Sequence, residues 1–190
     1  MNIKSDEQNL VNYPKGSILA FYMGQHPNTD DRMIEEIWSW NYEKLEEIHN
    51  YIQWLFPLVE KSHFNRSAPT LNDEIIQEFR TNEKLKICLT QSFKVMLKFY
   101  GLQLNDQSSD EIEITKSDEY PQRKIEWINR FNHNYLRITR ILTSLKILGL
   151  KPYAQAFLKC LDDIYKEEGD RIGSKTYTYW RNALSLTISN

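Results

Sequence analysis

The sequence has little of what secreted, membrane-spanning and nucleic-acid-binding proteins need. Only two of its 190 residues are cysteines, Cys88 and Cys160, and both lie within apolar helical patterns. We interpret them as buried free thiols in a reducing compartment, not as a disulfide. No apolar run approaches the roughly 20 residues that span a bilayer, and the first residues lack the apolar stretch of a signal peptide. A cytoplasmic location without a membrane span is therefore expected.

Charge and motifs exclude further classes. The net charge of −2 argues against a generally basic nucleic-acid binder. The sequence contains no Gly-rich phosphate loop, no Gly-x-Ser-x-Gly turn and no Cys/His set with zinc spacing. A nucleophilic dyad of Cys88 with His49 or His133 is conceivable, but Cys88 lies on an apolar face, where a thiol is inert. We expect no catalytic residue, no cofactor and no bound metal.

What the chain does have is apolar residues at helical spacing along most of its length. Its apolar share is 41%, and five Trp, eleven Tyr and eight Phe add large areas that a core can bury. Asn41 is a plausible helix N-cap, Pro57 limits one helix, and Gly101 and Gly149 are placed to end two others. The pattern predicts helices near residues 30–38, 41–56, 70–79, 85–100, 121–148, 152–165 and 174–188.

Residues 102–120 differ from the rest of the chain. They are acidic and polar, with two short alternating runs at 102–104 and 112–114, which fit either a small β-hairpin or a loop. Residues 1–18 show no sustained periodicity and are predicted to form a loose N-terminal arm. Residues 19–190 are predicted to form a single domain of the all-α class, a compact bundle-like array of six or seven helices around one core.

Two segments are distinctive enough to indicate a family. Residues 41–57 read NYEKLEEIHNYIQWLFP, and residues 133–142 read HNYLRITRIL. Both resemble signature stretches of the conserved N-terminal region of the opioid growth factor receptor family. With shorter matches near Phe21 and before Gly101, the resemblance extends over roughly residues 20 to 185.

The resemblance implies a helical domain and, for animal members, a receptor for an enkephalin peptide that restrains cell proliferation at the nucleus. This sequence has no Lys/Arg cluster of the kind that directs nuclear import. The fold therefore carries over more readily than the opioid biology. The resemblance assigns no particular residue to the ligand.

One candidate for chemistry lies in the first signature segment. Glu43, Glu46 and His49 stand on consecutive helical turns, and Glu46 with His49 has the i, i+3 spacing of carboxylate-bridged metal bundles. Such a site needs a second Glu-x-x-His, which the chain lacks. A histidine held by a hydrogen bond at the border of the apolar stripe is the simpler interpretation.

The second signature segment carries a basic-polar stripe of His133, Arg137, Arg140 and Ser144. Its arginines could bind a carboxylate or phosphate of a ligand. They could instead pair inside the protein with Glu43, Glu46 or Glu47 of the first signature segment, or simply be solvated. Such pairing would place the two signature helices side by side.

Tyr51 and Trp54 sit outside the densest apolar stripe of the first segment. They fit either a helix buried nearly all round or an aromatic groove suited to a peptide with Tyr or Phe side chains.

We therefore predict a non-enzymatic binding module that holds a short, enkephalin-like peptide or an acidic ligand. The expected partner is a peptide or protein ligand, without nucleic acid, and the oligomeric state is open. Two alternatives remain: an enzyme, metal-dependent or otherwise, that uses Glu46, His49 and His133, and a structural protein–protein interaction domain. The predicted ligand-binding residues are Tyr51, Trp54, His49, His133, Arg137 and Arg140.

Overall fold

The structure is a computed structural model that describes residues 11–63, 65–105 and 112–185. Within these ranges it contains ten helices and one two-stranded antiparallel sheet, which confirms the mostly helical fold. None of these helices combines the length and apolarity needed to cross a bilayer. The elements are α1 Ile18–Tyr22, α2 Ile34–Trp38, α3 Tyr42–Glu47, α4 Ile52–Leu55, α5 Asp73–Thr81, α6 Glu83–Phe99, β1 Leu102–Asn105, β2 Glu113–Lys116, α7 Tyr120–Trp127, α8 Asn134–Ile147, α9 Lys151–Ile172 and α10 Ser174–Ser185.

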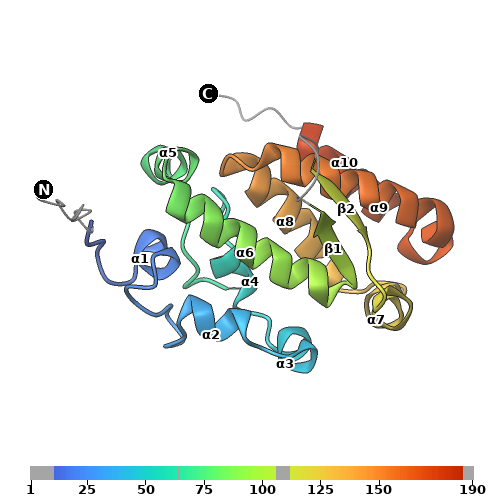
Figure 1. Cartoon of the computed structure of the whole chain (residues 1–190), viewed down its shortest axis with the longest axis horizontal. Helices are drawn as coiled ribbons and strands as arrows, with labels where there is room; N and C mark the ends of the chain where they lie inside the picture. The colour runs from blue at the N-terminus through green and yellow to red at the C-terminus, as the bar shows by residue number, and fades with distance from the viewer. Residues whose placement is uncertain (1–10, 64, 106–111, 186–190) are drawn as a thin grey trace, which may run out of the picture.

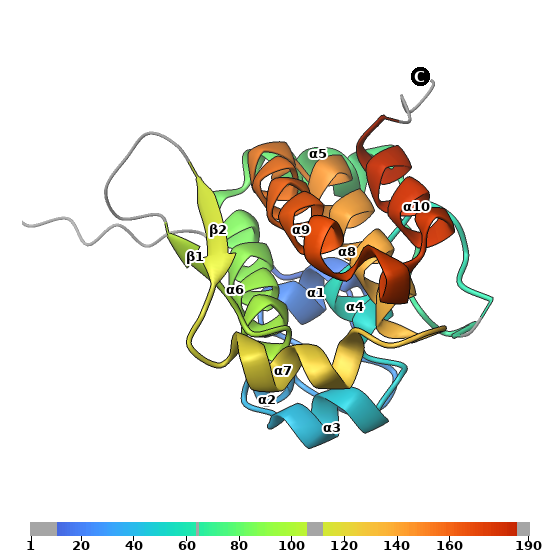
Figure 2. The same ribbon diagram turned by 90° about the vertical axis from the view of Figure 1, so that its right-hand side faces the viewer.

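Helix α6 crosses the middle of the molecule, between the short N-terminal helices and the C-terminal group of α8, α9 and α10 (Figure 1). Helix α8 packs against both α9 and α10. The hairpin β1–β2 and helix α10 lie at opposite sides of this array, as Figure 2 shows. The core is rich in aromatic side chains, such as Phe93 of α6 edge-on to Phe157 of α9 with ring centroids 5.4 Å apart.

Several local predictions are confirmed. The side chain of Asn41 accepts a hydrogen bond of 2.9 Å from the backbone N–H of Lys44 and so caps α3. Gly101 follows α6 with a φ of +76°, the left-handed conformation that glycine adopts without cost. Residues 102–105 and 113–116 pair as antiparallel strands, which decides for the hairpin between the two alternatives that the sequence left open. Cys88 and Cys160 are free thiols.

Two long helices of the prediction are each broken in two. The helix expected over 41–56 divides into α3 and α4, and the one expected over 121–148 divides into α7 and α8. In the second break Phe131, which lies inside the predicted helix, adopts a φ of +62° and is 99% exposed. These two breaks, together with the unexpected one-turn helix α1, raise the count from seven to ten.

The segment that precedes α1 is tied to the domain from residue 13 onward. The hydroxyl of Tyr13 donates a hydrogen bond of 2.7 Å to a carboxylate oxygen of Glu78, and the side chain of Ser17 caps α1. Residues 1–10 of the predicted N-terminal arm lie outside the described residues. The limits of the arm, like the cytoplasmic location, stay predictions.

Candidate ligand-binding sites

Arg137 of α8 joins the two signature segments. Its guanidinium donates from Nη1 to the carbonyl oxygen of Leu45 at 2.9 Å, and from Nη2 to those of Ile48 at 3.0 Å and Glu46 at 3.3 Å. The last carbonyls of a helix have no partner within the helix. Since α3 ends at Glu47, Arg137 supplies the donors that the end of α3 and the following turn would otherwise lack. Its side chain is only 5% exposed, so it is a structural group of the interior.

The same face of α8 contacts the rest of the first signature segment. Arg140 donates from Nη1 to the carbonyl oxygen of Phe56 at 3.1 Å, and Ser144 donates from Oγ to that of Pro57 at 2.9 Å. The two signature segments therefore pack side by side, as the internal alternative supposed. Their pairing, however, uses backbone carbonyls more than carboxylates.

Among the acidic residues predicted to pair with the arginines, Glu46 alone comes near Arg137 in the described structure. Its Oε2 lies 3.8 Å from Nη1 of Arg137 and accepts a hydrogen bond of 3.0 Å from Nδ2 of Asn134. Of the three acidic residues that the sequence offered as partners, the structure therefore places Glu46 beside Arg137, whereas the side chains of Glu43 and Glu47 are exposed.

The structure brings Glu46, His49 and His133 together at the junction of α3 and α8. Nε2 of His133 lies 3.5 Å from Oε1 of Glu46, and the His49 and His133 ring centroids are 4.9 Å apart. Burial, followed by the charge of Arg137, lowers the pKa of His133. In the described part of the chain, no three His, Cys, Asp or Glu side chains are arranged to hold a metal ion. The metal-dependent alternative therefore gains no support from this cluster.

Tyr51 and Trp54 face the core and present no aromatic surface. Both side chains are buried, and the Tyr51 hydroxyl donates a hydrogen bond of 2.9 Å to the carbonyl oxygen of Leu45. The guanidinium of Arg137 lies 5.5 Å from the Tyr51 ring centroid. Of the six predicted ligand-binding residues, three are thus interior groups, Arg140 and His133 are half-buried, and His49 is exposed. Their role in ligand binding stays a prediction.

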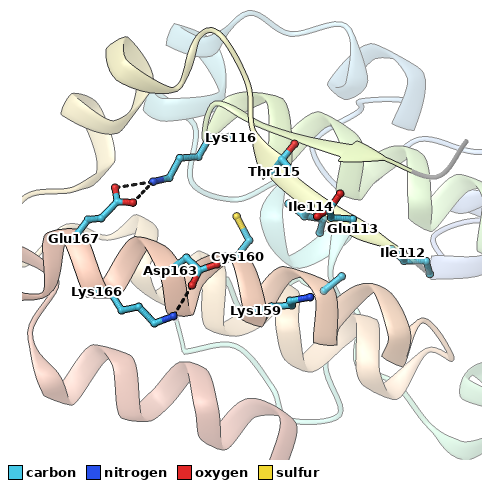
Figure 3. A pocket seen from close by; sticks show the side chains of 11 residues that line it. Ile112, Glu113, Ile114, Thr115, Lys116, Lys159, Cys160, Asp163, Lys166 and Glu167 are labelled. Atoms are coloured by element: carbon cyan, nitrogen blue, oxygen red, sulfur yellow. Dashed lines mark hydrogen bonds and ion pairs between the residues drawn. The ribbon is translucent and has the colours of Figure 1, made fainter. Parts of the chain in front are cut away.

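A groove that the sequence did not indicate runs between β2 and α9. It is open to solvent on one side and has a volume of about 620 Å³, within the range of ligand pockets. Figure 3 shows Lys116 of β2 reaching across to Glu167 of α9, and Lys166 turned to Asp163 on the same helix. Both contacts are ion pairs of 2.6 Å. The lining residues are Ile112, Glu113, Ile114, Thr115, Lys116, Ala156, Lys159, Cys160, Asp163, Lys166 and Glu167.

Local sequence explains how this groove forms. Residues 156, 160, 163 and 167 repeat at intervals of four, three and four, so they share one face of α9. On β2 the side chain of Ile114 is buried while its neighbours Glu113 and Thr115 are more exposed. Burial raises the pKa of the Cys160 thiol to about 12, so the groove contains no thiolate nucleophile. The spacing of these residues in the sequence indicates that they share one helix face. It does not indicate that β2 packs opposite that face.

The family model for the opioid growth factor receptor conserved region matches residues 12–186 of this chain. The chain belongs to the opioid growth factor receptor family. It is therefore a receptor-like domain, and the resemblance noted in the two signature segments is confirmed.

Curated members of the opioid growth factor receptor family give the same result. Opioid growth factor receptor-like protein 1 of Xenopus tropicalis is 39% identical over 145 residues, which cover 74% of this chain and 27% of that protein. The opioid growth factor receptor of Mus musculus is 38% identical over 141 residues, 71% of this chain and 21% of that protein. The chain thus spans about a quarter of the length of these relatives. No solved structure matches it.

Proposed function

We propose that this domain binds a short, enkephalin-like peptide and catalyses no reaction. Its relatives are named receptors for an opioid growth factor. The observation that carries the proposal is the groove between β2 and α9, which combines an apolar floor with charged groups of both signs. The floor is formed by Ile114, Ala156 and Cys160, all of them largely buried.

The charges of the groove suit a short peptide with free ends. Three lysines and three carboxylates line it, so its formal charge is balanced. A peptide with free termini carries one ammonium and one carboxylate group, and apolar or aromatic side chains between them would cover the floor. The charged lining residues are Lys116, Lys159, Lys166, Glu113, Asp163 and Glu167.

The cluster of Glu46, His49 and His133 at the junction of α3 and α8, the signature cluster, is a second place where the peptide could bind. His49 is exposed and the side chain of His133 is 39% exposed, whereas Tyr51 and Trp54 offer no surface. The groove is better supported, because it is concave and has an apolar floor.

Calorimetry with an enkephalin-like pentapeptide tests the proposal. Titration of the whole chain is compared with Ala156→Trp, which fills the groove, and with His49→Ala, which removes an exposed side chain of the signature cluster. A scrambled-order pentapeptide of the same composition is the control for nonspecific heat. We expect binding by the wild type, loss in Ala156→Trp, and retention in His49→Ala. Loss in His49→Ala alone would move the site to the signature cluster, and no heat from folded wild type would refute peptide binding.

A further inference from the structure

We propose that the peptide binds in an extended conformation, as a third strand along the outer edge of β2, with α9 as the facing wall. This inference rests on the proposed function and adds the mode of recognition. Extended peptides add to open sheet edges because main-chain hydrogen bonds supply affinity and alternate side chains supply specificity.

The register of the hairpin identifies the free backbone groups of β2. Ser117 donates its N–H to the carbonyl oxygen of Gly101 at 2.9 Å, and the strands pair antiparallel with Leu104 opposite Ile114. In an antiparallel pair, hydrogen-bonded and non-hydrogen-bonded positions alternate. The bonds to β1 therefore fall on residues 117, 115 and 113. The N–H and C=O groups of Ile114 and Lys116 point away from β1, toward the groove.

These outward groups have no backbone partner in the ranges that the structure describes. The sheet there consists of β1 and β2 alone, so β2 is an edge strand. Exposed edges are commonly blunted by charged side chains or covered by another element. Here α9 packs beside β2, but it leaves the groove of Figure 3 between the helix and the strand. The edge of β2 is thus partly covered by α9, and the groove between them leaves room for one extended peptide chain.

The dimensions of the edge select a short occupant. Strand β2 has four residues, and a strand rises about 3.3 Å per residue, so the edge is about 13 Å long. A peptide of about five residues in extended form covers that length. Its free ends then fall near the lysines and carboxylates at the two ends of the groove. A longer, strongly charged segment would meet like charges there, since lysines and carboxylates alternate along α9.

The pleat also predicts which peptide side chain matters. In neighbouring strands, residues directly opposite each other project to the same face. The peptide residue opposite Ile114 therefore points to the apolar floor of Ala156 and Cys160, while the residues on either side of it point to solvent. Binding in this mode therefore requires one central apolar side chain in the peptide, and it places no requirement on the two side chains next to it.

Two proline variants of the hairpin test this mode with the same pentapeptide. Ile114→Pro removes an outward N–H of β2 without removing a bond to β1, and proline is tolerated on that side of an edge strand. Leu104→Pro is the matched control, because Leu104 lies opposite Ile114 in the register, so its N–H points outward from the other edge of the hairpin, and its side chain does not line the groove. We expect Ile114→Pro to bind at least about tenfold more weakly, and Leu104→Pro to bind within about twofold of wild type. Circular dichroism and thermal melting establish that both remain folded.

A second measurement on wild-type protein does not depend on the folding of any variant. Each amide of the pentapeptide is N-methylated in turn, and the affinity of each analogue is measured by calorimetry. Strand addition predicts alternation: methylation at every second amide abolishes binding, and methylation between them leaves it within about threefold.

The outcomes separate this mode from the proposed function. Peptide binding that is equal in Ile114→Pro and wild type, or affinities that show no alternation, would overturn strand addition while leaving peptide binding intact. A folded wild type that binds no peptide would overturn both. A peptide-independent dimer in analytical ultracentrifugation that Ile114→Pro dissociates would show that a second copy of the chain occupies the edge, and this too would overturn the mode.

Discussion

Replacing Arg137 by methionine should destabilise the domain strongly. The substitution keeps an apolar stem of similar length and removes the donors to the carbonyl oxygens of Leu45, Glu46 and Ile48. Leu45 keeps a hydrogen bond from the Tyr51 hydroxyl, so two carbonyls lose their partner. An unsatisfied buried acceptor costs about 1–3 kcal/mol. Since the bonds to Glu46 and Ile48 are only partly buried, water recovers part of this, and we expect a loss of about 2–4 kcal/mol.

Urea denaturation followed by circular dichroism measures this loss. With a slope of about 3 kcal/mol per molar for a chain of this size, the midpoint should fall by about 1 M. Arg130→Met is the matched control, because Arg130 lies exposed in the connection between α7 and α8, and its effect should stay within about 0.5 kcal/mol. Arg137→Lys should fall between the two, since an ammonium cannot reach three carbonyls in a fixed plane. A midpoint for Arg137→Met equal to that of Arg130→Met would refute the structural role of the guanidinium.

Further predictions concern single side chains. Trp54→Ala should cost about 3–5 kcal/mol in urea denaturation, because the ring is fully buried; a loss below about 1 kcal/mol would contradict the packing. Phe131→Gly should be neutral or raise the melting temperature, because it relieves a positive φ and gives up no buried area; a clear drop would contradict this. Cys160, whose pKa is raised to about 12, should resist iodoacetamide at pH 8 until the protein is denatured, as read by mass spectrometry. Because the pKa of folded His133 lies below its ordinary 6.5, the unfolded chain takes up the proton first, and stability should fall as the pH drops through and below that value. His133→Gln should flatten this part of the pH–stability curve measured by urea denaturation, and an unchanged curve would refute the assignment.

Sequence periodicity predicted the features that depend on neighbours along the chain. The cap at Asn41 and the glycine after α6 follow from local residue types. The alternating runs near 102–104 and 112–114 were compatible with the hairpin but equally with a loop. The helical class follows from the repeated apolar stripes.

The breaks in the two long predicted helices could not be predicted from local residue types or periodicity. The apolar stripe of residues 41–56 continues smoothly through the break, and no proline or glycine marks it. The turn after Glu47 forms because Arg137, about ninety positions later, satisfies the freed carbonyls. Charge complementarity suggested an ion pair, and Glu46 lies 3.8 Å from Arg137, but most of the acceptors of the guanidinium are backbone carbonyls, which every sequence has.

For the same reason, the sequence predicted only part of the candidate site. The signature residues were recognised, but whether Tyr51 and Trp54 faced a groove or the core depended on how the broken segment turned. The groove beside β2 needs two elements, each ordinary by itself, to be placed side by side by the rest of the fold.

The capping of α3 by Arg137 also constrains the order of folding. The carbonyls of the corner, the turn between α3 and α4, accept hydrogen bonds from a residue about ninety positions further along the chain. Such a contact of high sequence separation forms late in folding, because a long loop must close first. During synthesis, α3 and α4 therefore emerge long before the residue that fixes the turn between them. We expect the amide protons of this corner to gain protection from hydrogen exchange only when α8 docks, so that the two signature segments behave as one cooperative unit despite their separation.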